Sequence, residues 1–140
     1  MSSLAISIVT YCTDPSCLLS SLKCVYASKV SATVTVVGNS PSDSLKIVCN
    51  DFKCNYIHNP SNPGYGAAHN VAIRNSLVAA LDYHLVLNAD VIFSENVLRS
   101  IMSFMEKNKN IELIMPKVLN PDGSIQRLCK LVPTPIDLIV

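Results

Sequence analysis

The chain has 140 residues, of which 49% are hydrophobic and 15% charged, and its net charge is +1. This length suits one compact domain, and the balanced charge lacks the basic surface typical of nucleic-acid-binding proteins. No apolar run approaches the roughly 20 residues of a membrane-spanning helix. We therefore expect a core-rich globular protein, soluble or at most peripheral to a membrane, that has no nucleic-acid partner.

Strands and helices are expected to alternate over the first 118 residues. Runs rich in β-branched and apolar residues predict five strands, at 4–11, 33–37, 54–58, 83–87 and 112–118. Between them, apolar residues at three- and four-residue spacing predict four helices, beginning near Asp14, Ser40, Tyr65 and Glu95. The helix at 65–81 is apolar around most of its circumference and is expected to be buried on two sides. Repeated strand–helix units predict an α/β fold with a mostly parallel central sheet and helices on both faces.

The pattern changes in the last part of the chain. A turn signal at 120–123, Asn-Pro-Asp-Gly, is followed by a segment that alternates as far as Leu128, which predicts a hairpin. Residues 131–140 are apolar and carry no helix cap or closing element. We interpret the chain as a polypeptide that stops, at Val140, before its architecture is complete.

The cysteines form no recognisable disulfide or metal motif. No pair has the spacing Cys-x-x-Cys, and the beginning of the chain does not resemble a signal peptide. The six are Cys12, Cys17, Cys24, Cys49, Cys54 and Cys129. We expect buried, free thiols in a cytoplasmic protein.

Polar side chains follow four of the predicted strands at their carboxyl ends. They are Thr10 and Tyr11, Asn39 and Ser40, Asn59, and Asn88 and Asp90. Singly, such residues are typical of turns and caps, but in a parallel sheet the carboxyl ends of the strands meet where ligands bind. Asn88 and Asp90 can point to the same side and present hard oxygen ligands to Mg²⁺ or Mn²⁺. The sequence therefore predicts one polar site for a nucleotide-type ligand.

A second polar cluster follows the turn at 59–66, early in the helix that comes next. His69 there suits either a packed, hydrogen-bonded histidine or a partner for a phosphate at the helix N-terminus, and both interpretations stay open. Gly64 and Gly66 either let the backbone approach a ligand closely or only shape the turn.

Five segments carry a resemblance to a known family, at 6–11, 36–40, 59–70, 87–91 and 116–126. In this order, over about residues 4 to 135, the chain resembles the N-terminal part of a family 2 glycosyltransferase, especially the rhamnosyltransferase-like branch. The resemblance implies a Rossmann-like GT-A fold, C-terminally incomplete here. It also implies inverting transfer of rhamnose or a similar deoxysugar from a dTDP- or UDP-linked donor to a cell-surface polysaccharide or lipid-linked acceptor, usually with Mg²⁺ or Mn²⁺.

The same resemblance implies roles for single residues. The positions that would bind the donor nucleotide are Thr10, Tyr11, Gly38, Asn39, His69, Asn70 and Asn88, and the metal ligand would be Asp90. Residues 1–118 would form the donor-binding domain, and residues 119–140 a hairpin and the truncated start of the acceptor-binding half.

The chain departs from the family pattern at three points. Gly38 stands where an aspartate that contacts the nucleoside is common, and Cys12 stands where asparagine is common. No position matches the family's general base, a group that is typically worth about 10²- to 10⁴-fold in rate, and we expect that base beyond Val140. We therefore expect this chain alone to be inactive in transfer, with donor binding retained.

A non-catalytic nucleotide- or protein-binding α/β domain remains open as an alternative. A dinucleotide-dependent oxidoreductase is disfavoured because residues 12–16 lack the glycine-rich turn, and a receiver-like domain because Thr10 and Tyr11 supply no acids. Further expectations are a cytoplasmic location, with peripheral association at the inner face of the membrane, and self-association through exposed apolar surface.

Overall fold

Strands and helices alternate along residues 2–126, the part of the chain that this computed structural model describes. The elements are β1 (Leu4–Thr10), α1 (Pro15–Ala27), β2 (Ala32–Gly38), α2 (Lys46–Asp51), β3 (Asn55–His58), α3 (Tyr65–Val78), β4 (Tyr83–Asn88) and α4 (Val97–Lys107). The chain divides into two compact units, residues 1–107 and 108–140, and all of these elements belong to the first unit.

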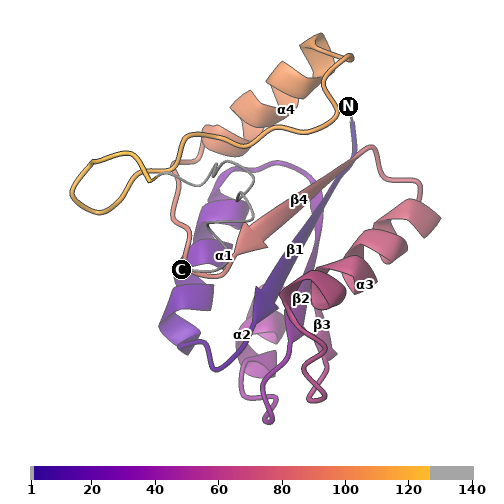
Figure 1. Cartoon of the computed structure of the whole chain (residues 1–140), viewed down its shortest axis with the longest axis vertical. Helices are drawn as coiled ribbons and strands as arrows, with labels where there is room; N and C mark the ends of the chain where they lie inside the picture. Colours follow the sequence, from indigo (N-terminus) through magenta and orange to yellow (C-terminus); the bar gives the residue numbers. More distant parts are fainter. Residues whose placement is uncertain (1, 127–140) are drawn as a thin grey trace, which may run out of the picture. The chain divides into compact units, whose positions relative to one another are not determined.

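The four strands form one sheet in the order β3-β2-β1-β4, and all neighbouring pairs are parallel (Figure 1). Thr10 at the end of β1 pairs with Gly38 at the end of β2, and Val9 pairs with Asn88 at the end of β4. The carboxyl ends of these three strands therefore meet at one edge of the sheet, as the sequence predicts.

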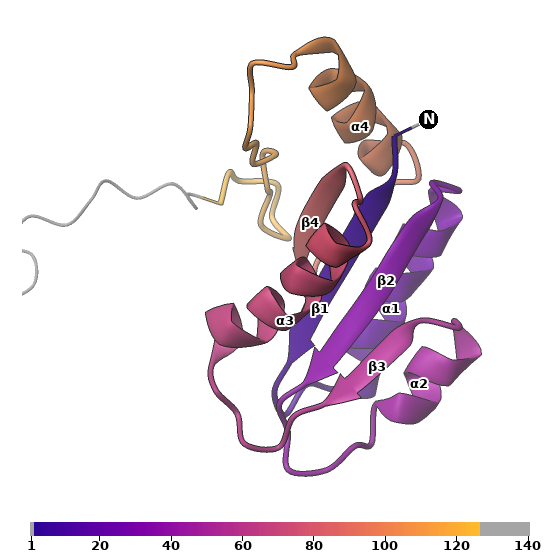
Figure 2. The same cartoon turned by 90° about the vertical axis from the view of Figure 1, so that its right-hand side faces the viewer.

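Helices cover both faces of this sheet, with α1 and α2 on one face and α3 on the other (Figure 2). Because side chains alternate along a strand, Ile6 and Ile8 of β1 enter the core with α1, whereas Val9 packs with Ala68 of α3. The larger core also includes Leu98 of α4. The predicted α/β fold with a parallel sheet is confirmed.

Local sequence explains where α1 begins. The Asp14 side chain accepts a hydrogen bond from the Ser16 backbone N–H at 2.7 Å, and Pro15 is the first helical residue. Both features are typical of a helix start, because proline lacks the N–H that the first turn cannot pair and aspartate pairs one that remains. The Ser16 side chain and, second, its backbone N–H hold the pKa of Asp14 below its usual value. The predicted cap is confirmed.

Helix α2 begins later than predicted, at Lys46 instead of near Ser40. The Ser40 hydroxyl accepts a hydrogen bond from the Cys12 backbone N–H at 2.8 Å, so this side chain joins two loops and caps no helix. Leu45, which precedes α2, offers no side-chain cap. The prediction failed here because the competing partner of Ser40 is remote in the sequence.

Helix α3 is buried on one side only, so the prediction of two buried sides was wrong. Its buried residues are Ala68, His69, Ala72 and Ser76. Leu77 and Val78 are 71% and 89% exposed. The small alanines distributed around this helix gave the sequence pattern little power to separate its faces.

In the second unit, residues 112–118 form no strand, which contradicts the predicted fifth strand. An apolar run forms a strand only where a ladder partner exists, and Leu113 remains 88% exposed. Leu119 and Ile125 do form an antiparallel bridge around the turn at 120–123, so the hairpin is present as far as residue 126. The predicted boundary after residue 118 falls inside this second unit.

Two of the sequence predictions fall on the last part of the chain. They are the remainder of the hairpin, as far as Leu128, and the apolar end that runs to Val140. Both lie outside the described residues, which end at residue 126.

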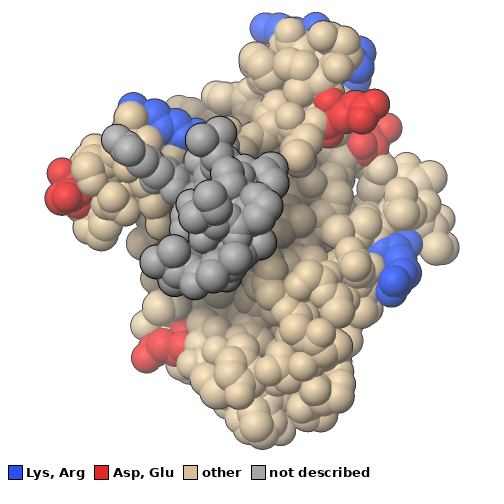
Figure 3. All heavy atoms as spheres, in the orientation of Figure 1, with Lys and Arg blue, Asp and Glu red and all other residues tan. Residues whose placement is uncertain are grey.

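Two further predictions concern membrane-spanning helices and cysteine thiols, and the predicted burial of the thiols is confirmed only in part. Within residues 2–126, no helix combines the length and the apolar character needed to cross a bilayer. The five cysteines in this range are free thiols, with Cys49 buried, Cys12 exposed and the others half-buried. On the face shown in Figure 3, a few acidic and basic side chains lie among mostly uncharged residues.

Candidate functional site

The loops that follow β1, β2 and β3 are tied together by backbone hydrogen bonds at the carboxyl edge of the sheet. The Asn39 N–H donates to the Thr10 carbonyl oxygen, and the Asn59 N–H donates to the Gly38 carbonyl oxygen, both at 2.8 Å. Because Asn88 and Asp90 continue from the neighbouring strand β4, residues predicted from separate segments lie at one edge. We call Thr10, Asn39, Asn88 and Asp90 the strand-end site.

Buried and exposed groups alternate at this site. Thr10 and Asn39 are each only 1% exposed, whereas Tyr11 is 57% exposed and presents its ring to solvent. Asn39 Oδ1 is buried and has no hydrogen-bond partner among the described residues. Buried polar atoms are nearly always paired, so an unpaired acceptor here indicates that a ligand or water normally completes it.

Tyr65 connects α3 to the end of β4. Its hydroxyl donates to Asn88 Oδ1 at 2.5 Å, and both side chains are exposed. Partial burial and, second, the charge of the Asp90 carboxylate raise the pKa of Tyr65. Sequence reasoning missed Tyr65 as a site residue, because its only signal was its position at the first turn of a helix.

His69 lies one turn further along α3 and is 3% exposed. Its ring meets the Tyr65 ring edge-on, with centroids 4.4 Å apart, and Nδ1 is 2.8 Å from the Ser7 hydroxyl. Burial, and second the neighbouring His84, lower the pKa of His69, so the ring is neutral near pH 7. Asn70, the next residue, is exposed.

The oxygen atoms at the end of β4 fit a divalent cation that takes most of its ligands from a substrate. Within residues 2–126, no three His, Cys, Asp or Glu side chains gather as a metal cage. Asp90 supplies one exposed carboxylate and Asn88 one amide oxygen. Mg²⁺ is commonly held by one or two carboxylates together with phosphate oxygens and water, and this donor set fits such an ion.

The general base is the part of the predicted machinery that the strand-end site does not contain. None of the described residues, 2–126, matches the general base that the resemblance implies. The donor-binding role of the strand-end site and the location of the base therefore both stay predictions.

The departure at Gly38 has a structural counterpart. A Cβ added to Gly38 would lie 2.3 Å from the hydroxyl oxygen of Tyr56 and about 3.0 Å from its ring. The Tyr56 phenol therefore occupies the space that a longer side chain at position 38 would need. This chain cannot accommodate the aspartate common in the family at this position without moving Tyr56.

We expect Gly38→Ala to lower the free energy of unfolding by about 1–3 kcal/mol, the usual cost of overpacking a filled site. In a Tyr56→Phe background this cost should shrink, because the closest atom is gone. Gly66→Ala is the matched control: nothing lies within 4 Å of its added Cβ, and alanine favours a helix. Urea unfolding of the four variants measures the coupling, and equal costs in both backgrounds would contradict the steric explanation.

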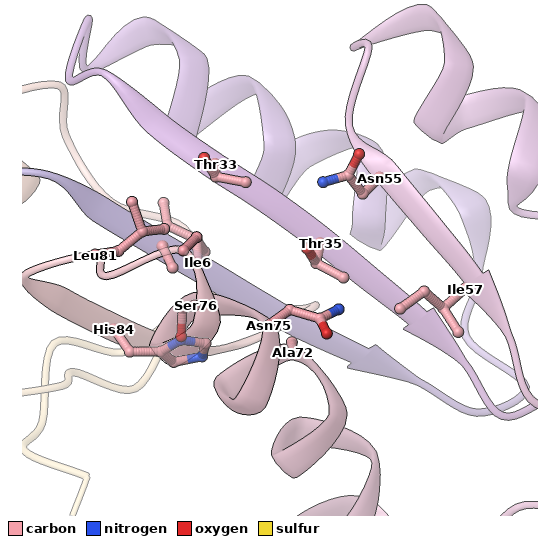
Figure 4. A pocket seen from close by; sticks show the side chains of 12 residues that line it. Ile6, Thr33, Thr35, Asn55, Ile57, Ala72, Asn75, Ser76, Leu81 and His84 are labelled. Carbon is pink, nitrogen blue, oxygen red and sulfur yellow. The ribbon is translucent and has the colours of Figure 1, made fainter.

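A cavity of about 340 Å³ lies elsewhere on the α3 face of the sheet (Figure 4). Its lining includes Thr33, Asn55, Asn75 and His84, from the amino-terminal halves of strands and the second half of α3. None of the predicted site residues lines it. The cavity and the strand-end site are therefore separate features.

Residues 6–127 match the family described as glycosyl transferase family 2. The chain belongs to this family. Over 93 residues it is 32% identical to the low-salt glycan biosynthesis hexosyltransferase Agl10 of Haloferax volcanii, a match that covers 66% of this chain and 30% of the relative. The chain thus spans about 30% of the length of that curated relative.

Two solved structures have folds similar to that of this family 2 glycosyltransferase domain. The crystal structure of S. aureus TarS superimposes with a TM-score of 0.61 at 18% identity, covering 78% of this chain and 20% of TarS. The structure of S. aureus TarS 1-349 gives a TM-score of 0.56 at 22% identity, covering 78% of this chain and 33% of that one. These likenesses confirm the predicted GT-A-type fold.

Proposed function

We propose that residues 2–126 bind the nucleoside diphosphate sugar of a family 2 glycosyltransferase. The proposal rests on buried polar atoms that have no hydrogen-bond partner. Three buried side-chain atoms of the described residues have no hydrogen-bond partner, namely Ser21 Oγ, Asn39 Oδ1 and His69 Nε2. Two of these three belong to residues for which the resemblance implies donor binding, and unpaired buried groups of this kind are expected where a ligand completes them.

Each side chain of the site suits a part of such a donor. The exposed Tyr11 ring offers a surface for the base, and Asn39 Oδ1 can accept from a base N–H or a ribose hydroxyl. Asp90 would hold the cation, with Asn88 oriented by the Tyr65 hydroxyl. Mg²⁺ or Mn²⁺, when bound, would supply charge stabilisation for the departing diphosphate.

The finer parts of the proposal rest on the resemblance. They are inverting transfer, a dTDP- or UDP-linked rhamnose or similar deoxysugar, and a polysaccharide or lipid-linked acceptor. We also propose that the general base is not among the described residues, because none matches the family's base. We further propose a cytoplasmic location at the inner face of the membrane. We also propose self-association, which is supported by exposed apolar side chains such as Ile47 and Ile92, each 72% exposed.

Calorimetric titration of the chain with UDP and with dTDP, each with and without Mn²⁺, tests this function. We expect at least one of the two to bind, and to bind at least about tenfold more weakly when the metal is removed, since the diphosphate and Asp90 would share the cation. UMP is the control, because a single phosphate offers fewer oxygens to that ion. Absence of binding, or binding that ignores the metal, would favour the non-catalytic alternative.

A further inference from the structure

Four buried or half-buried side chains form a continuous hydrogen-bonded chain across the α3 face of the sheet. Ser76 Oγ lies 2.8 Å from His84 Nδ1, and His84 Nε2 lies 2.7 Å from Ser7 Oγ. Ser7 Oγ also lies 2.8 Å from His69 Nδ1. The chain therefore runs from the last turn of α3 through β4 and β1 back to the first turns of α3, and Figure 4 shows its Ser76 and His84 end.

The proton positions in this chain follow from its Ser76 end. We assign the single Ser76 hydroxyl proton to its hydrogen bond with the Ile73 carbonyl oxygen, 2.8 Å away, because that oxygen can only accept. Ser76 Oγ must then accept from His84, and Nδ1 of His84 carries a proton. Burial lowers the pKa of His84, which keeps the ring neutral, and a neutral imidazole has a single N–H. His84 Nε2 is consequently an acceptor.

The same reasoning passes through Ser7 to His69. Ser7 gives its only proton to His84 Nε2, so it accepts from His69 Nδ1, which must carry a proton. Since the His69 ring is also neutral, its Nε2 has a lone pair and no proton. This Nε2 is the buried atom that has no partner among the described residues.

We propose that Ser76, His84 and Ser7 are positioning residues that hold His69 in the Nδ1–H tautomer, so that its Nε2 accepts a hydrogen bond from an N–H or O–H of the ligand. That the ligand is a donor nucleotide rests on the proposed function. A phosphate oxygen needs a hydrogen-bond donor, so this arrangement turns His69 away from the phosphate-binding role considered from the sequence. The histidine instead contributes to recognition of the base or a sugar.

NMR of the imidazole nitrogens in the full chain tests the relay without any ligand. In the wild-type protein we expect both His69 and His84 to be neutral with the proton on Nδ1. In Ser76→Ala, His84 Nδ1 loses its acceptor, so His84 should move its proton to Nε2, Ser7 should turn, and His69 should become the Nε2–H tautomer. Ser76→Thr should restore the wild-type pattern.

Ser20→Ala is the matched control, because the Ser20 hydroxyl also donates to a backbone carbonyl of its own helix, that of Ser16 at 2.8 Å, and α1 carries no histidine. It should leave both tautomers unchanged. A protonated Nε2 on His69 in the wild-type protein, or no change of His69 in Ser76→Ala, would overturn the proposal.

A second arm compares UDP and pyrophosphate, each with Mn²⁺. Ser76→Ala should weaken UDP about tenfold, the value of one hydrogen bond, and should not weaken pyrophosphate. Unchanged UDP affinity, or equal losses for both ligands, would overturn the ligand role of His69. If the wild-type chain binds dTDP and not UDP, dTDP replaces UDP in this arm. If it binds neither, the proposed function fails and this ligand role with it, while the NMR result still decides the relay.

Discussion

Asp90→Asn is expected to remove Mn²⁺-dependent binding of UDP, weakening it by at least about 100-fold. The substitution keeps the size of the side chain but replaces the only carboxylate of the strand-end site with a neutral amide. Loss of an outer-shell partner alone typically weakens metal binding about 10- to 100-fold, so loss of the ligand itself should exceed that range. Calorimetry with UDP and spin-resonance titration of free Mn²⁺ measure the nucleotide and the metal separately.

Asp51→Asn provides the control for this substitution. Asp51 is the last residue of α2 and is exposed, so the control makes the same change of charge away from the strand-end site. Its UDP affinity should equal that of the wild-type chain, and neither variant should change the urea midpoint. If Asp90→Asn still bound UDP tightly and in a metal-dependent way, Asp90 would not be the metal ligand.

Leu22→Ala is expected to lower the free energy of unfolding by about 2–5 kcal/mol. Leu22 lies on the inner side of α1, is 0% exposed and belongs to the core with Ile6, Ile8 and Val36. The substitution loses the transfer free energy of the removed carbons and leaves a cavity that the rigid sheet closes only partly. This loss is a large fraction of the roughly 5–15 kcal/mol that stabilises an ordinary domain. Urea unfolding at constant slope gives the difference.

Leu77→Ala is the matched substitution on the outer side of α3. Leu77 is 71% exposed, so its truncation should change the free energy of unfolding by no more than about 0.5 kcal/mol. A cost comparable with that of Leu22→Ala would mean that the outer side of α3 is covered in solution. The pair therefore tests the one-sided burial of this helix directly.

The sequence predicted those parts of the fold whose causes are local. Asp14 and Pro15 start α1 because the partners of this cap lie within two residues. The alternation of side chains between the two faces of β1 is a property of any strand and does not depend on its neighbours. Prediction failed where the cause was remote in the sequence. The Ser40 hydroxyl accepts a hydrogen bond from the Cys12 N–H, and the apolar run at 112–118 forms no strand.

The same distinction between local and remote causes applies to the candidate site. The carboxyl ends of β1, β2 and β4 could be placed at one edge from the parallel pattern alone, and with them Thr10 and Asp90. The contact between Tyr65 and Asn88 joins α3 to β4, and the approach of Tyr56 to Gly38 joins two strands, so neither has a periodic signal. Both depend on side-chain packing that only coordinates reveal.

The pairing of β1 with β4 also governs how the molecule can be made. Leu4 of β1 pairs with Tyr83 of β4. The edge of β1 that faces β4 therefore stays unpaired during synthesis until almost the whole first unit has been made. Pairings between strands so distant in sequence are slow to form, and an uncovered edge invites misassembly meanwhile. Since Asn88 and Asp90 arrive with β4, the proposed nucleotide binding requires that β4 has been made and has paired with β1.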